Sequence, residues 1–173
     1  MNLLQKSLLT HKLTRLGSTS SAEFVNRNPR NLERLRIGRK PDGYHLEKPG
    51  RKFWHKLSLT STKRTVSAQV VHFINGPVIE AKTSEWALRK QLYSTLDTSA
   101  YMNLGRVFAQ RCLESGISEI YCDLEPKEGS KVDRFLKEVV NGGVKLSEPD
   151  VYTKPEPWDQ FRPEKPWEVA ESE

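Results

Sequence analysis

The residue types best suited to chemistry are the arginines, lysines and asparagines that alternate over residues 26–40. Guanidinium groups are planar forks that match phosphate oxygens, and asparagine amides can reach base edges or 2′-hydroxyl groups. A second cluster, at residues 51–56, combines cations with a Trp and a His ring that could stack on bases. Both clusters predict contacts with RNA. The residues assigned to this interface are Arg27, Asn28, Arg30, Asn31, Arg34, Arg36, Arg39, Lys40, Arg51, Lys52, Trp54, His55, Lys56, Lys63 and Arg64.

Three prolines and the absence of DNA-binding motifs refine the expected partner. Pro29, Pro41 and Pro49 are expected to keep the basic segment extended, so that its cations spread along a groove. We expect at most one helical turn, around residues 32–37. RNA is favoured over DNA because no recognition helix or dimerising zipper is visible.

The charge of the chain is sorted along its length. The 173 residues carry a formal charge of +6, with 28 Lys and Arg against 22 Asp and Glu. Residues 23–64 hold 12 bases and 4 acids, whereas residues 65–149 hold 10 bases and 11 acids. A basic arm on a neutral body indicates a polyanion partner, although a merely solvated basic surface would show the same charge.

Residues 1–22 are typical of a mitochondrial targeting segment. They combine leucines, hydroxyl residues and three bases, and the first acid of the chain is Glu23. The bases interrupt the apolar positions, so the segment lacks the long apolar core of a secretory signal. The alternative is an ordinary basic extension, and cleavage between about residues 16 and 23 would distinguish the two.

The sequence lacks the patterns of catalytic sites. No Gly-rich phosphate loop, nucleophile elbow or metal-binding His pair is present, so we expect neither catalytic residues nor a metal or cofactor. Cys112 and Cys122 are interpreted as small buried hydrophobic residues. No apolar run approaches the roughly 20 residues of a membrane span. The expected role is therefore binding, with no DNA, no membrane span and no homo-oligomer.

The elements that must position these residues begin with strands. Alternating apolar residues predict three short strands within residues 56–82 that form an antiparallel meander. Asn75 and Gly76 are expected to supply the two positive φ angles of the second hairpin turn.

Helices and one further strand follow. Thr83 or Ser84 is expected to cap a helix that starts at Glu85, and two further helices are expected at about 102–115 and 132–140, with a strand at 117–123 between them. The predicted fold is α/β, with the meander and the further strand in a mixed sheet, about three packed helices, and extended N- and C-terminal arms.

The last part of the chain is acidic and rich in proline and tryptophan. Such sequence has no regular core of its own. Trp158 and Trp167 are expected to anchor the tail on another protein, the alternative being that they fold back onto the body. The predicted organisation is 1–22 for targeting, 23–55 for the basic RNA-binding arm, 56–148 for the α/β domain and 149–173 for the tail.

Several of these stretches together resemble a known family, the mitochondrial form of large-subunit ribosomal protein eighteen. The similarity spans roughly residues 24–148 and includes Asn26 to Glu33 and the strand Ala68-Gln69-Val70. It also includes a helix pattern, Gly-xxx-Ala-x-Arg-xxxx-Gly-Ile. The residues that match this pattern are Gly105, Ala109, Arg111, Gly116 and Ile117.

This resemblance implies a structural constituent of the large subunit of the mitochondrial ribosome, in the matrix, which supports mitochondrial translation. Its implied partners are neighbouring ribosomal proteins and structural RNA of the central protuberance, where bacterial relatives bind 5S rRNA. Thr60-Ser61-Thr62 replaces the Phe-Arg-Ser usual in bacteria, and the loop 123–131 is short of arginine. The RNA could therefore be 5S rRNA, a structural tRNA or large-subunit rRNA. The alternative is a free mitochondrial RNA-binding or RNA-import escort protein.

Overall fold

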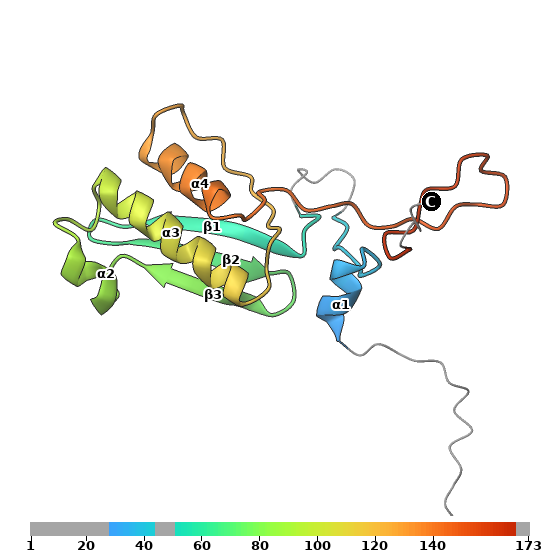
Figure 1. Ribbon diagram of the computed structural model, residues 1–173, viewed down its shortest axis with the longest axis horizontal. Helices are drawn as coiled ribbons and strands as arrows, with labels where there is room; N and C mark the ends of the chain where they lie inside the picture. The colour runs from blue at the N-terminus through green and yellow to red at the C-terminus, as the bar shows by residue number, and fades with distance from the viewer. Residues whose placement is uncertain (1–27, 44–50, 169–173) are drawn as a thin grey trace, which may run out of the picture.

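Three consecutive strands form the centre of the molecule. The computed structural model describes residues 28–43 and 51–168, so the predicted targeting segment 1–22 and Arg27 lie outside the described residues. Strands β1 (His55–Ser61), β2 (Val66–His72) and β3 (Gly76–Lys82) form an antiparallel sheet in the order β1-β2-β3 (Figure 1). This confirms the meander, with β1 starting one residue earlier than the predicted domain boundary.

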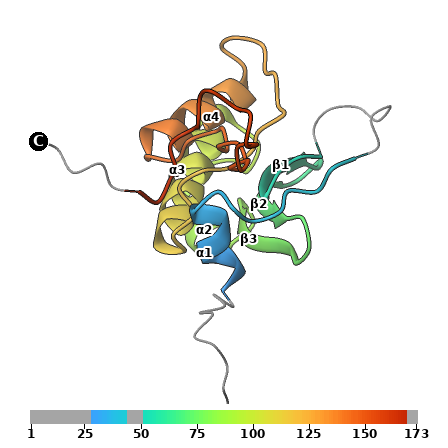
Figure 2. The same cartoon turned by 90° about the vertical axis from the view of Figure 1, so that its right-hand side faces the viewer.

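The sheet buries one face. Along β2, the side chains of Val66, Ala68, Val70 and His72 are buried and alternate with partly exposed residues. Helices α3 (Thr98–Glu114) and α4 (Lys131–Asn141) lie on this buried face (Figure 2). The alternation of apolar and polar residues in the sequence therefore follows from the packing of one face of the sheet against the helices.

The β2–β3 hairpin turn was predicted only in part. A three-residue loop, residues 73–75, joins His72 to Gly76, which pair across the ladder. Only Gly76 has a positive φ, of 73°, and Asn75 does not. A loop of this length places a single glycine in the left-handed region after the turn, whereas the predicted two-residue turn needs two such residues.

The helices begin at different residues than predicted. Helix α3 starts at Thr98 rather than near 102 because the side chain of Asp97 caps it and accepts from the Ala100 N–H at 2.7 Å. The short helix α2 (Trp86–Gln91) has Glu85 at its N-cap. Thr83 does not cap it because this residue is fully buried and its Oγ1 accepts from the Val66 N–H at 3.0 Å.

The strand predicted at 117–123 is reduced to two isolated parallel bridges, Lys56 to Tyr121 and Glu119 to Lys145. The Tyr121 N–H donates to the His55 carbonyl at 2.7 Å, and the Leu57 N–H donates to the Tyr121 carbonyl at 2.9 Å. Among the described residues, the parallel pairing expected for a mixed sheet is limited to these two bridges.

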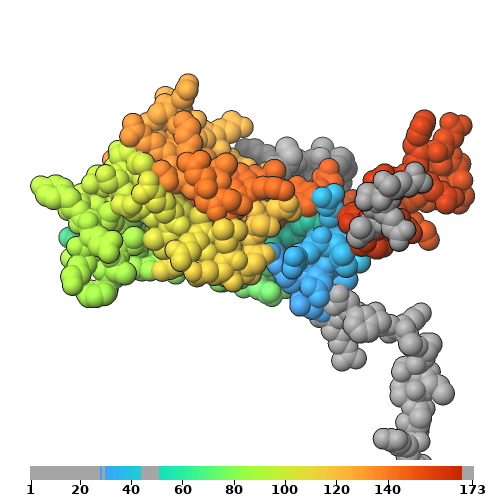
Figure 3. Space-filling model, viewed as in Figure 1, coloured from blue at the N-terminus to red at the C-terminus, as the bar shows by residue number. Residues whose placement is uncertain are grey.

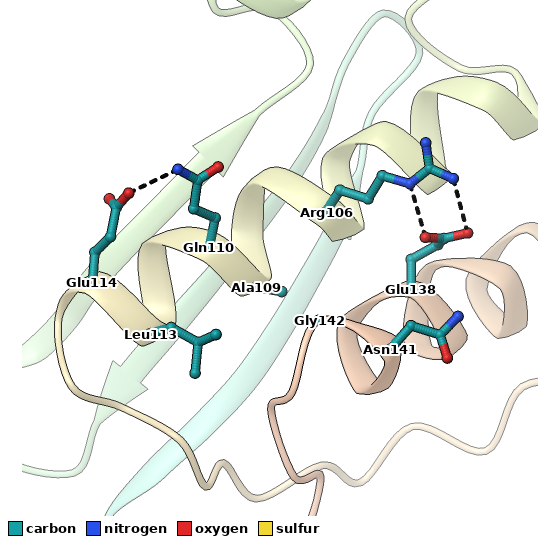
Figure 4. Close-up of a pocket in the computed structure, with 8 residues that line it drawn as sticks. All are labelled: Arg106, Ala109, Gln110, Leu113, Glu114, Glu138, Asn141 and Gly142. Carbon is teal, nitrogen blue, oxygen red and sulfur yellow. Dashed lines mark hydrogen bonds and ion pairs between the residues drawn. The ribbon is translucent and has the colours of Figure 1, made fainter.

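Helices α3 and α4 cross closely because small residues meet at the crossing. A Cβ atom built on Gly142 would lie 2.5 Å from the Cβ of Ala109, and one on Gly105 would lie 2.8 Å from the Phe135 carbonyl oxygen. Above the crossing, Arg106 donates to both carboxylate oxygens of Glu138, at 2.9 and 3.3 Å (Figure 4). Two positions of the resemblance motif, Gly105 and Ala109, are thus explained by packing.

The basic segment is not extended throughout. Helix α1 (Pro29–Arg34) begins at a proline, which fits the first helical position because the missing N–H has no intrahelical partner there. The single helical turn expected around residues 32–37 is therefore a helix that starts earlier, and Pro29 begins it instead of keeping this part of the segment extended. The side chain of Asn28 caps α1 and accepts from the Arg30 N–H at 3.1 Å.

Helices α1, α3 and α4 end in the same hydrogen-bond pattern. In α1, the Ile37 N–H donates to the Leu32 carbonyl at 3.0 Å, and the Arg36 N–H donates to the Glu33 carbonyl at 2.9 Å. These are the two bonds of a Schellman motif, whose next residue after the C-cap is left-handed. That residue is Gly116 after α3 and Gly143 after α4, but Arg36, with φ 59°, after α1. None of the described helices is long and apolar enough to cross a membrane.

Candidate nucleic-acid interface

Helix α1 is attached to the sheet by a buried side-chain hydrogen bond. Glu33 is 7% exposed, and its carboxylate lies 2.9 Å from His72 Nε2. The other ring nitrogen of His72, Nδ1, accepts from the backbone N–H groups of Ile74 and Asn75, each at 3.2 Å. A neutral His72 ring therefore carries its proton on Nε2 and donates it to Glu33.

Arg30 forms the second attachment. Its Nη2 donates to the Gly116 carbonyl at 2.5 Å, and its Nη1 lies 3.3 Å from His55 Nδ1 and 3.6 Å from the Glu33 carboxylate. Burial, aided by the Arg30 charge and by His72, lowers the pKa of His55 to about 4. His55 is therefore neutral near pH 7, and its Nδ1 can accept from Arg30.

These contacts define a link rather than a metal centre. The ligand atoms of Glu33, His55 and His72 all lie within 4.8 Å of one another, which is close enough for a bound cation. However, His72 Nε2 carries a proton that it donates to Glu33, so this nitrogen has no free lone pair for a metal. The Arg30 guanidinium already faces His55 Nδ1. A cation placed there would meet a fixed positive charge.

Lys40 attaches the end of the basic segment to residues that follow α4. The Glu148 carboxylate accepts from the backbone N–H groups of Trp54 and His55, at 2.8 and 2.6 Å. Burial raises the pKa of Glu148, while these bonds act in the opposite direction. Lys40 Nζ donates to the Pro149 carbonyl at 2.6 Å and lies 3.7 Å from the Glu148 carboxylate.

Two rings assigned to RNA stacking are buried. Trp54 is 3% exposed and lies under Lys40, whose Nζ is 4.4 Å from the ring centroid. His55 is 5% exposed at the start of β1. Neither ring can stack on a base in this structure, so that part of the prediction was wrong. The reason is that His55 is the first residue of β1 and that the Trp54 ring lies beneath Lys40, so both rings belong to the body.

Other assigned cations already have acidic partners. Lys56 Nζ lies 2.6 Å from Asp123, and Lys52 Nζ lies 2.7 Å from Asp42. The side chains of Lys52 and Asp42 remain largely exposed. Arg51 is exposed as well.

Four polar residues of α1 and of the segment that follows it are exposed. The exposed guanidinium groups of Arg34, Arg36 and Arg39 have no ion pair with any described residue. Asn31 is exposed beside them. We call these four residues the outer face. The structure thus divides the predicted interface into inward residues that attach the segment and outward residues that remain available.

Lys63 and Arg64 lie apart from the outer face. They occupy the turn between β1 and β2, at the end of the sheet opposite α1 (Figure 1). The Arg64 carbonyl accepts from Thr95 Oγ1 at 2.5 Å, which places residues before α3 at the same end. The predicted interface is therefore not one continuous surface.

The tail begins beside α1. The Tyr152 N–H donates to the Arg36 carbonyl at 2.6 Å. The Trp167 ring packs edge to face on Tyr152, with 5.0 Å between centroids, and remains 40% exposed. Trp158 is 76% exposed. Docking of these tryptophans on another protein stays a prediction.

Sequence reasoning missed the residues that hold the segment in place. Glu33 was the only acid among the cations of α1, which was a local signal. Its partner His72 lies 39 residues away, and Glu148 lies more than 100 residues beyond Lys40, so no local pattern connected them.

Comparison with known proteins adds an independent finding. No family model matches the chain. The chain is 39% identical over 131 residues to the large ribosomal subunit protein uL18m of Caenorhabditis elegans, and the match covers 73% of this chain and 77% of that protein.

Proposed function

The chain belongs to the uL18m family of mitochondrial large-ribosomal-subunit proteins, and from this premise we propose that its outer face binds structural RNA of that subunit. The observation that carries the proposal is that some cations of the basic segment face inward and bind the body, whereas others face outward. Glu33, Arg30 and Lys40 face inward and are satisfied by the body. The outer-face guanidinium groups are exposed and form no ion pair with a described residue, and only Arg39 acts on a nearby carboxylate, since its charge is a minor cause of the lowered pKa of Asp42.

The proposed mechanism is binding without catalysis. Each outer-face arginine would neutralise a phosphate and release condensed counterions, so that the affinity falls steeply with salt. The buried links of α1 would hold these cations in place before RNA arrives, which reduces the ordering cost of binding.

A triple variant tests this role. Arg34→Ala, Arg36→Ala and Arg39→Ala together should remove up to three phosphate contacts and flatten the log–log salt dependence of RNA binding by about two units. The probe is a labelled transcript of mitochondrial large-subunit ribosomal RNA in a filter-binding titration. The matched control removes three exposed tail cations, with Lys154→Ala, Arg162→Ala and Lys165→Ala. An unchanged slope for the outer-face variant contradicts the proposal.

The identity of the RNA is a finer part of the proposal. We propose RNA of the central protuberance, with 5S rRNA, a structural tRNA and large-subunit rRNA as the candidates. Crosslinking the endogenous protein and sequencing the attached RNA distinguishes them. Sedimentation with the large subunit at moderate salt supports the ribosomal role, whereas a free escort protein would stay near the top of the gradient.

The two ends of the chain complete the proposal. Residues 1–22 are proposed to direct mitochondrial import, and processing between about residues 16 and 23 would test this. The tail is proposed to dock on a neighbouring ribosomal protein, because Trp158 leaves a large apolar ring 76% exposed on the free chain.

A further inference from the structure

Helix α2 and the segment after it expose two aromatic rings at the end of the molecule opposite α1 and the tail (Figure 3). Trp86 is 76% exposed and Tyr93 is fully exposed. The buried side chain of Leu88 attaches α2 to the core, so Trp86 lies on the outer side of this helix. Exposed large rings are costly in water and commonly mark contact surfaces.

Four cations lie at the same end. Arg89 and Lys90 are exposed in the last turn of α2, and Lys63 and Arg64 are exposed in the β1–β2 turn. The hydrogen bond from Thr95 Oγ1 to the Arg64 carbonyl, 2.5 Å long, ties that turn to the segment after α2. We call Lys63, Arg64, Trp86, Arg89, Lys90 and Tyr93 the far-end patch.

The charge of this patch is not neutralised by the protein. None of its four cations forms an ion pair with a residue that the structure describes. The nearby carboxylate of Glu85 is already bound by Arg111, at 2.5 and 2.9 Å. Lys90 Nζ lies 5.1 Å from the centroid of the Trp86 ring, which orients a cation beside an exposed aromatic face.

We propose that the far-end patch is a second RNA-contact surface, which receives unpaired nucleotides. Its cations would neutralise phosphates while Trp86 and Tyr93 stack on bases, because stacking needs bases that are not paired within a helix. A polyanion fits the patch because its four exposed cations lie at one end of the molecule and no carboxylate of the described residues forms an ion pair with them.

This proposal goes beyond the role of the outer face. The two surfaces lie at opposite ends of β1, a strand of seven residues and thus roughly 20 Å long. They contact different RNA segments, so the protein would bridge two places in the RNA. The far-end patch would bind even if the outer face did not.

Two variants of the full-length protein test the patch with the labelled large-subunit transcript. Replacing all four cations, with Lys63→Ala, Arg64→Ala, Arg89→Ala and Lys90→Ala, should flatten the log–log salt dependence by roughly two to three units. Trp86→Ala with Tyr93→Ala should weaken binding about fivefold or more per stacked ring and leave the salt slope unchanged. The matched control for the rings is Trp158→Ala with Phe161→Ala, which removes two exposed tail aromatics. Circular dichroism of each variant verifies folding.

The outcomes separate this inference from the proposed function. Loss of binding in both patch variants supports the inference, whatever the outer-face variant does. Normal RNA binding by both patch variants overturns it, and a defect of those variants confined to incorporation into the large subunit assigns the patch to a protein instead. If only the outer-face variant changes the salt dependence of RNA binding, the proposed function is supported and the RNA-binding role of the far-end patch is contradicted.

Discussion

Arg36 occupies a backbone position that usually belongs to glycine. The equivalent residues after α3 and α4 are Gly116 and Gly143. A side chain in the left-handed region costs free energy because its Cβ approaches the carbonyl oxygen that follows. Non-glycine residues held in this way are commonly retained for function, and Arg36 points its guanidinium outward from α1.

We expect Arg36→Gly to raise the free energy of unfolding by about 1 kcal/mol while it weakens RNA binding. The strain disappears with the side chain, and so does one phosphate contact. Denaturant unfolding and filter binding measure the two effects. Arg36→Ala is the control, because it removes the guanidinium and keeps the strain. A less stable glycine variant would show that the Arg36 side chain contributes to packing.

His55 gives the folded state a dependence on pH. Its pKa is lowered from 6.5 to about 4, so the unfolded chain binds the proton more readily. The stabilisation is complete above pH 6.5 and is lost as the pH falls through 6.5 towards 4. At pH 5 the expected loss is on the order of 1 to 2 kcal/mol relative to pH 7.5.

Denaturant unfolding of the wild type and of His55→Gln at pH 7.5 and 5.0 checks this expectation. The variant should lose much of the difference between the two pH values. Glu148 is retained in both proteins, and its raised pKa acts in the opposite direction, favouring the folded state as the pH falls. The same pH dependence in both proteins would assign the effect to another group.

At the scale of elements, the spacing of apolar residues correctly predicted those strands and helices that bury a single face. The alternation of Val66, Ala68 and Val70 and the helical spacing of Phe135 and Val139 placed β2 and α4 correctly, because each pattern is set by one buried face. The burial of Trp54 and the attachment of α1 were missed because their partners are distant in the sequence. Which residues of the predicted interface face inward and which face outward is decided by the packing of α1 on the sheet, and this packing cannot be read from the sequence.

The crossing of α3 and α4 gives a test at this scale. Gly142→Ala places a Cβ where Ala109 already lies, only 2.5 Å from its Cβ, and should destabilise the fold by about 1 to 3 kcal/mol. The backbone itself tolerates alanine, since φ at Gly142 is −70°. Thermal unfolding measures the loss. Ala109→Gly alone should also destabilise the fold, by about 1 kcal/mol, because this residue lies inside α3. The double variant should lose less than the sum of the two single losses, and additive losses would place the clash elsewhere.

At the scale of the whole molecule, the charged residues behind the net charge of +6 lie on different surfaces, for which different roles are proposed. Part of the positive charge of the basic segment is used internally, where Arg30 faces Glu33 and Lys40 faces Glu148. The outer face and the far-end patch hold cations without acidic partners in the described chain, at opposite ends of the sheet (Figure 1). The acidic tail leaves the body beside the outer face through Tyr152.

Deletion of residues 150–173 should impair incorporation into the large subunit without weakening the binding of isolated RNA. The deletion removes four more acids than bases and spares every outer-face residue. Gradient sedimentation of the tagged protein and filter binding measure the two properties. Trp158→Ala within the intact chain should reproduce part of the defect. Normal incorporation of the truncated protein would remove the proposed role of the tail.

The contacts of α1 and of Lys40 also constrain the order in which the chain can reach its final form. Glu33 meets a residue 39 positions later, Arg30 one 86 positions later, and Lys40 one 109 positions later. In a chain that emerges from the N-terminus, α1 can therefore be fully attached only after Gly116 has been made, and the end of the basic segment at Lys40 only after Pro149 has been made. The first part of the described protein to be made is therefore fully attached only after most of the chain has been made.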